Sequence, residues 1–194
     1  MRLKPLLAAA AVSLSIGISA QNQPIRIHAS TLLDGTGKVL HNATIVVQGT
    51  KIRAVETSAG GPATYELGRL TVMPGMIDVH AHLGWHFGPD GRYQPRDNSA
   101  AQDILYSAEN AYVTLMAGFT TIQSPGQAND VELREAIARG FLPGPRVLTS
   151  IRVLNETSGT PDELRVKVRA LKADGADVVM SATVEYFIPP RSPP

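Results

Sequence analysis

The chain has 194 residues, of which 43% are hydrophobic and 18% are charged, a composition typical of one globular domain with at most a small appendage. Its formal net charge of +1 gives no reason to expect nucleic acid as a partner. The absence of cysteine excludes disulfide bonds, thiolate metal sites and a lipidated cysteine anchor.

Residues 1–20 have the three-part layout of a secretory signal peptide. Arg2 and Lys4 precede the apolar stretch 6–18, and small residues ending in Ala20 follow it. The apolar stretch is too short to cross a bilayer core of about 30 Å comfortably. We therefore expect cleavage near Ala20, a periplasmic or secreted location and no stable membrane span; the alternative is an uncleaved membrane anchor.

Residues 21–73 have the pattern of a small β module. Alternating or β-branched segments are separated by turn residues such as glycine and aspartate, which predicts strands joined by short turns. His28 and His41 lie in this module, and we expect them to have surface or structural roles. The expected extended segments are 25–29, 43–47, 51–55 and 65–73.

From residue 74 the pattern changes to strands that alternate with helices, which predicts βα units, a parallel sheet and an α/β fold. Helices are expected to begin at residues that cap a helix N-terminus well: Asp97 or Ser99, then Asn129 or Asp130, then Thr160. The tail, 181–194, is expected to be irregular and rich in proline: residues 185–188 could be extended, whereas residues 189–194 can form neither a helix nor a central strand. The expected strands are 76–82, 119–123, 146–150 and 176–180, and the expected helices end near 117, 139 and 174.

The segment with the most chemical information ends in two histidines, His80 and His82. It follows the turn pair at Pro74, and the two-residue period of a strand would place Asp78, His80 and His82 on one face. Two neighbouring neutral imidazoles can hold a divalent metal ion. The alternative is a pair of polar residues exposed at a sheet edge, because an isolated His-x-His motif is a weak signal.

Segment 72–82 resembles the first barrel strand of the metal-dependent amidohydrolase superfamily, since the turn, the apolar strand and the histidine pair occur together and in order. Segment 33–55 resembles the β-sandwich flank of this superfamily, and several later segments resemble its imidazolonepropionase-like and prolidase-like members. The resemblance covers roughly residues 25–180. It implies an N-terminal β-sandwich flank (21–73) followed by about half of a TIM-type (β/α) barrel (74–180).

This resemblance implies metal-dependent hydrolysis of a carbon–nitrogen bond in a small amide, cyclic amide or dipeptide. His80 and His82 would hold a divalent metal, expected to be zinc, at the mouth of the barrel, and the metal would lower the pKa of a bound water. His86, in the following loop, is a weaker candidate for a substrate contact or a third ligand. Its alternative is a solvated loop histidine.

The chain departs from the superfamily pattern in its last part. Relatives place a lysine, which becomes a carbamylated metal bridge, where this chain has Met180, and a thioether cannot replace a bridging anion. Relatives take two further histidines and the catalytic aspartate from later strands, so no catalytic residue is assigned here. We expect the chain to be inactive alone, or active with a second polypeptide, and to self-associate through open sheet edges. The alternatives are a truncated or frameshifted non-catalytic product and an exported binding module.

Overall fold

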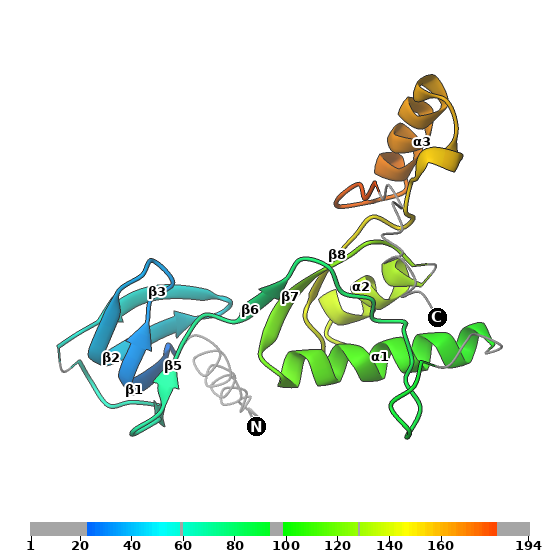
Figure 1. The fold of residues 1–194 in the computed structure, drawn as a ribbon. Coiled ribbons are helices and arrows are strands. Elements are labelled where there is room, and N and C mark those ends of the chain that lie inside the picture. Colours follow the sequence, from blue (N-terminus) through cyan, green and yellow to red (C-terminus); the bar gives the residue numbers. More distant parts are fainter. Residues whose placement is uncertain (1–22, 59, 94–98, 128, 182–194) are drawn as a thin grey trace, which may run out of the picture. The chain divides into compact units, whose positions relative to one another are not determined.

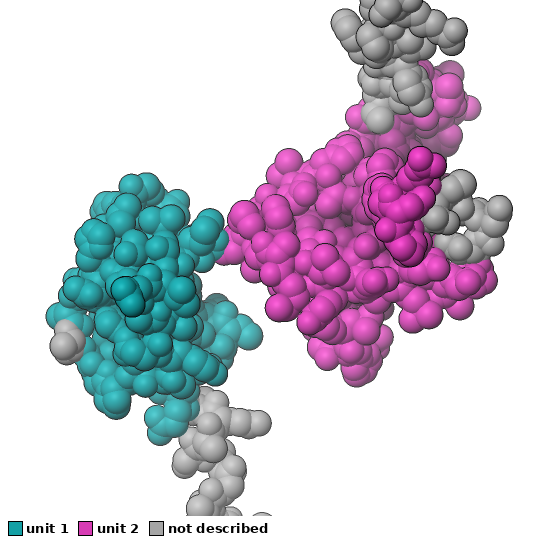
Figure 2. Space-filling view, turned by 60° about the horizontal axis from the view of Figure 1, so that its bottom comes forward, with its two compact units in different colours: residues 1–74 teal, residues 75–194 magenta. Residues whose placement is uncertain are grey.

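The structure is a computed structural model that describes residues 23–58, 60–93, 99–127 and 129–181. The chain forms two compact units, Met1–Pro74 and Gly75–Pro194 (Figure 2). The predicted signal peptide, the possible helix cap Asp97 and residues 182–194 of the predicted tail lie outside the described residues. In the described part, no helix is long and apolar enough to cross a membrane.

The first unit contains one five-stranded sheet (Figure 1). β2 pairs with β1 and β3 in antiparallel fashion, whereas β4 and β5 both pair with β1 in parallel. Buried Leu32, Ala43 and Ile45 form its small apolar core. The strands are β1 (Ile25–Leu33), β2 (Val39–Gln48), β3 (Lys51–Glu56), β4 (Tyr65–Glu66) and β5 (Thr71–Val72).

The strands predicted over 25–29, 43–47 and 51–55 are confirmed, whereas the segment predicted over 65–73 forms two short strands, β4 and β5. The predicted sandwich is not what the described residues of this unit form. A sandwich needs two stacked sheets. Here the late strands β4 and β5 add to the free side of β1, so they extend the first sheet rather than building a second layer.

The second unit contains a three-stranded parallel sheet in the order β6-β7-β8, with helices in the connections. This arrangement confirms the predicted βα units, because parallel neighbours need a crossover between them. The strands are β6 (Met76–Asp78), β7 (Phe119–Ser124) and β8 (Arg146–Thr149); the helices are α1 (Ala100–Met116), α2 (Asp130–Ala138) and α3 (Pro161–Ala173), with a 3₁₀ turn, η2 (Glu156–Ser158).

The core of this unit lies between the sheet and the helices α1 and α2. Ile122 of β7 and Leu133 of α2 have no exposed surface, and Val147 of β8 and Ala111 of α1 are nearly as buried. Ile122 and Val147 are register partners on neighbouring strands, so both helices pack against the same face of the sheet.

Two of the three helices begin at a capping box; Thr160 is the predicted cap of α3, and Ser99 is one of the two predicted alternatives for α1. Ser99 accepts a hydrogen bond from the N–H of Gln102, and Thr160 accepts one from the N–H of Glu163. The third helix, α2, has Asn129 at its N-cap position without a side-chain capping bond.

The first predicted strand of the second unit is shorter than expected, since β6 ends at Asp78 and does not reach the histidines. The Asp78 carboxylate accepts the backbone N–H of His80 at 2.9 Å, which turns the chain away from a regular strand. The N–H of Ala81 then donates to the carbonyl of Gln123 on β7 at 3.0 Å.

The prediction of a fourth strand over 176–180 is wrong. The N–H groups of Asp177 and Val178 both donate to the carbonyl of Thr149, at 2.8 and 3.4 Å. This segment therefore crosses the end of β8 instead of pairing along it, and only an isolated bridge between Leu154 and Ser181 follows.

Candidate functional site

His80 and His82 lie just beyond the carboxyl end of β6, where Asp78 and Gln123 fix the backbone on either side. The structure brings their two rings together: the centroids are 5.2 Å apart and the ring planes are inclined by 67°. Two imidazoles at this separation can approach one cation from different directions.

The segment after the histidines is tied to α1 and to the loop between β7 and α2. The side chain of Gln127 accepts the N–H of Gly84 at 3.1 Å. The amide of Asn110 on α1 donates to the carbonyls of Leu83 (2.6 Å) and Trp85 (2.8 Å). A Cβ at Gly84 would lie 1.3 Å from the Gln127 amide nitrogen, so a larger residue there would displace this tie.

Aromatic side chains contact the histidines of this segment. The ring of His82 stacks on Trp85, with 4.2 Å between centroids and 8° between planes. His86, the weaker sequence candidate, stacks on Tyr106 of α1 at 3.6 Å. The structure therefore places His86 against the helix, while His80 and His82 form a pair.

The fit of a metal ion to this pair is partial. The pair supplies two nitrogen ligands, whereas zinc sites in proteins have three or four protein ligands. Among the described residues, no group of three or more His, Asp or Glu side chains is placed to hold a metal ion. Met180, which stands where relatives are expected to have the bridging lysine, ends the segment 176–180, and its carbonyl accepts the N–H of Leu154 at 3.0 Å.

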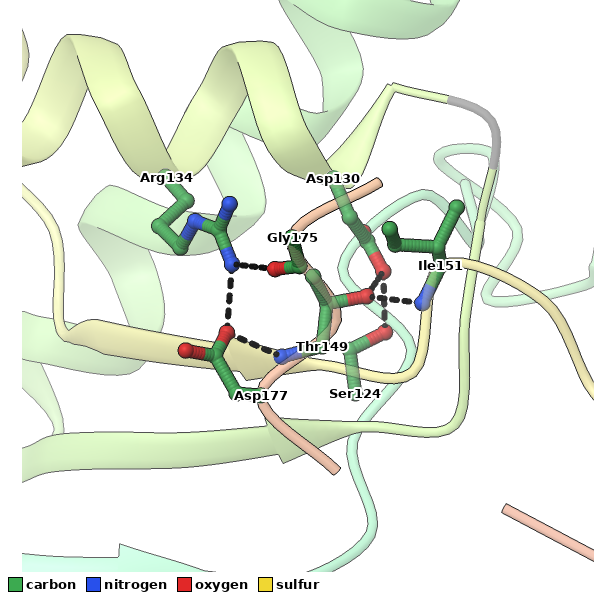
Figure 3. A network of polar contacts seen from close by, with 7 residues as sticks. All are labelled: Ser124, Asp130, Arg134, Thr149, Ile151, Gly175 and Asp177. Carbon is green, nitrogen blue, oxygen red and sulfur yellow. Dashed lines mark hydrogen bonds and ion pairs between the residues drawn. The ribbon is translucent and has the colours of Figure 1, made fainter. Parts of the chain in front are cut away.

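A buried polar network at the carboxyl ends of β7 and β8 was missed by the sequence analysis (Figure 3). The carboxylate of Asp130, only 1% exposed, accepts the hydroxyls of Ser124 at 2.6 Å and Thr149 at 2.7 Å. The Thr149 hydroxyl oxygen accepts the N–H of Ile151 at 2.8 Å. These bonds offset the cost of burying the polar carboxyl group.

A second set of bonds holds the segment after α3 against the same sheet edge (Figure 3). Arg134 donates to the carboxylate of Asp177 at 2.5 Å and to the carbonyl of Gly175 at 2.8 Å. The same Asp177 carboxylate accepts the N–H of Thr149 at 3.1 Å. The carboxyl ends of β7 and β8 are therefore held by hydrogen bonds to each other, to α2 and to the segment after α3.

Comparison with known proteins shows which proteins this chain is similar to. No family model matches the sequence. The chain is 30% identical over 146 residues to the ochratoxinase of Aspergillus niger, a match that spans 70% of this chain and 30% of the ochratoxinase.

Solved structures share the fold. A Xaa-Pro dipeptidase with methionine bound in its active site superposes with a TM-score of 0.68 at 24% identity, covering 82% of this chain and 47% of the dipeptidase. A protein described as a prolidase of Bifidobacterium longum has a TM-score of 0.63 at 31% identity, covering 82% and 40% of the two chains.

The chain thus spans less than half the length of each of these proteins. The resemblance that the sequence predicted is confirmed: this chain is similar, over most of its length, to hydrolases of the prolidase-like and amidohydrolase-like kind.

Proposed function

We propose that this chain carries the first part of the metal site of a hydrolase that cleaves a carbon–nitrogen bond in a small amide, cyclic amide or dipeptide. The observation that carries the proposal is the pairing of His80 and His82, with ring centroids 5.2 Å apart beyond the carboxyl end of a parallel strand. The similarity to a dipeptidase and to an ochratoxinase supports the reaction class.

His80 and His82 would hold the metal, and we propose zinc because imidazole nitrogen suits it well. When bound, such a metal supplies an acidified water and polarises the substrate carbonyl. The chain's own residues orient the ligands: Asp78 holds the backbone of His80, and Trp85 stacks on His82. His86 remains a weaker candidate for a substrate contact.

We further propose that the sheet β6-β7-β8 and its helices are part of a TIM-type (β/α) barrel. The parallel strand order and the similarity to solved amidohydrolase-like chains support this. In barrels of this type the chemistry lies at the carboxyl ends of the strands. The histidine pair lies past that end of β6, and the Ser124–Thr149–Asp130 network lies at that end of β7 and β8.

Because the described residues supply two ligands, we expect the chain alone to bind metal weakly and to hydrolyse amides no faster than the uncatalysed reaction. The other ligands would come from residues outside the described part or from another polypeptide. β6 and β8 are the outer strands of the described sheet, so self-association through their edges belongs to the proposal. We also propose that residues 1–20 direct export of the chain.

The metal proposal is tested with Ni²⁺, which imidazole binds well and which quenches indole fluorescence. Trp85 is the single tryptophan of the chain and stacks on His82, so its emission reports this site alone. Saturable quenching that zinc reverses is expected. It should be lost in His80→Ala, which leaves the His82–Trp85 stack in place, and kept in His41→Ala, which alters an exposed histidine of β2. Equal quenching in all three proteins would contradict the proposal.

A second candidate is an exported binding module without catalysis. It is favoured by the finding that the described residues contain no group of three metal-binding side chains. This candidate predicts a cooperatively melting chain in which Ni²⁺ does not quench Trp85 in a saturable way. The Ni²⁺ titration together with a thermal melt separates the two functions.

A further inference from the structure

Three large aromatic side chains gather on the loop that follows the histidine pair. Trp85, Phe87 and Tyr93 are 42%, 52% and 45% exposed. Tyr93 contacts both of the others, with ring centroids 5.5 Å from Trp85 and 6.0 Å from Phe87. A single exposed aromatic residue needs no explanation, but a contiguous exposed group is typical of a binding surface.

The backbone beneath these rings is held by hydrogen bonds. Phe87 and Tyr93 form an antiparallel bridge, and the N–H of Gly88 donates to the carbonyl of Arg92 at 2.9 Å. The carbonyl of Trp85 accepts the amide of Asn110 on α1. A surface that is ordered before binding loses little conformational entropy when a ligand arrives.

This aromatic surface directly adjoins the proposed metal ligands, because Trp85 stacks on His82 and His82 lies beside His80. Apolar walls next to a few polar groups are the usual composition of small-molecule sites. Aromatic rings also favour other rings, through offset-stacked or edge-to-face contacts. The expected ligand therefore has a planar apolar ring close to a polar group that can reach the histidines.

We propose that Trp85, Phe87 and Tyr93 form a binding surface for an aromatic ring of the substrate, so that the preferred substrates are amides with an aryl group next to the scissile bond. The choice of an amide rests on the proposed function. The binding of the ring requires no metal, and the two can be tested separately.

The test uses the full chain, labelled with ¹⁵N and kept in EDTA. Its single tryptophan gives one indole N–H signal, which is followed by NMR during addition of N-benzoylglycine or N-acetylglycine. The two probes share the amide and the carboxylate and differ in the ring. We expect saturable shifts with N-benzoylglycine at about tenfold lower concentration than with N-acetylglycine, the size of one aromatic contact.

Phe87→Leu and Tyr93→Leu keep apolar side chains in the loop and remove one ring each, and both should weaken N-benzoylglycine binding. Phe141→Leu is the matched control, because Phe141 is an exposed aromatic residue (70% exposed) outside this loop. Equal affinity for the two probes overturns the proposal, as does an equal effect of all three substitutions. If the ring binds while Ni²⁺ does not quench Trp85, the aromatic surface stands and the metal proposal fails; the reverse result rejects only the surface.

Discussion

At the residue scale, the carboxylate of Asp130 holds the carboxyl ends of β7 and β8 together. It begins α2, and its two hydroxyl partners, Ser124 and Thr149, end the neighbouring strands β7 and β8. One buried acceptor therefore joins three elements. Removing it would leave two buried hydroxyl groups without this partner.

We predict that Asp130→Ala lowers the free energy of unfolding by about 2–3 kcal/mol, the usual cost of leaving buried polar groups unsatisfied. Urea denaturation followed by circular dichroism measures the loss. Glu132→Ala, an exposed change in the same helix turn, is the control and should shift the value by less than about 0.5 kcal/mol. Similar losses in both variants would show that the network adds no stability.

Gly126 provides a second prediction at this scale. It follows β7 with φ of +119°, and a Cβ there would lie 2.6 Å from the backbone nitrogen of Arg152. Gly126→Ala should therefore cost at least about 2 kcal/mol of stability, from backbone strain and a clash that no side-chain rotation relieves. Gly61→Ala, where a Cβ meets nothing within 4 Å, should be nearly neutral. Thermal melts of the two variants measure the difference. Equal melting midpoints would show that Gly126 is not required at this position.

At the element scale, what the sequence predicts well is what short-range bonds determine. The capping boxes of α1 and α3 are formed within four residues, so Ser99 and Thr160 identify both helix starts. The end of β6 is less predictable, because it depends on the hydrogen bond that the His80 N–H donates to Asp78 and on pairing with the distant strand β7. The segment 176–180 depends on distant bonds to Thr149, which no local pattern contains.

In the candidate site, too, the sequence predicts the local feature and misses the long-range one. The spacing of His80 and His82 is visible in the sequence and predicts that the rings lie together, as they do. The network of Asp130 was missed because its partners lie 6 and 19 residues away. The one signal that pointed to it was the presence of polar residues at the ends of successive apolar strands, where parallel strands share an edge.

The capping box of α3 makes this helix sensitive to acid. The backbone N–H of Thr160 lowers the pKa of Glu163 below its ordinary value, and the Thr160 hydroxyl and Lys167 lower it further. Because the pKa is lower in the folded state, the stabilisation is fully present above the pKa of the unfolded chain. It is lost as the pH falls through the lower, folded value.

We therefore predict that α3 frays at its first turn on acidification. Thr160→Ala removes the hydroxyl and keeps the backbone N–H, so it should raise the pKa of Glu163 part of the way toward that of an unfolded chain, as measured by ¹³C NMR of its carboxyl group. Glu163→Gln can still form a capping box and should remove this pH dependence from amide exchange in α3. An unchanged pKa in Thr160→Ala would show that the Thr160 hydroxyl does not lower the pKa of Glu163.

At the scale of the whole molecule, the chain consists of a β unit and an α/β unit with separate cores (Figure 2). The chemistry discussed above belongs to the second unit. The described α/β sheet has three strands, and the matched solved chains are more than twice as long as the part covered. The histidines of the first unit lie in its own sheet, His28 beside Glu66 and His41 exposed on β2, as a surface or structural role predicts.

The predicted export of the whole chain is tested by its mature N-terminus. Expression in a Gram-negative host should give a periplasmic or secreted protein that begins at Gln21 after cleavage. Leu14→Arg, which interrupts the apolar stretch, should keep the protein inside the cell with an intact N-terminus. A wild-type protein found in the cytoplasm and starting at Met1 would contradict the export proposal.

The early end of β6 has a consequence for ion preference. Past Asp78 the histidines lie outside the regular strand, although the N–H of Ala81 still donates to the carbonyl of Gln123 on β7. The two side chains can therefore turn to suit an arriving cation without disrupting the strands. Ions of different radius should then be accepted almost equally, and discrimination between zinc, cobalt and nickel would fall to the ligands that complete the coordination shell.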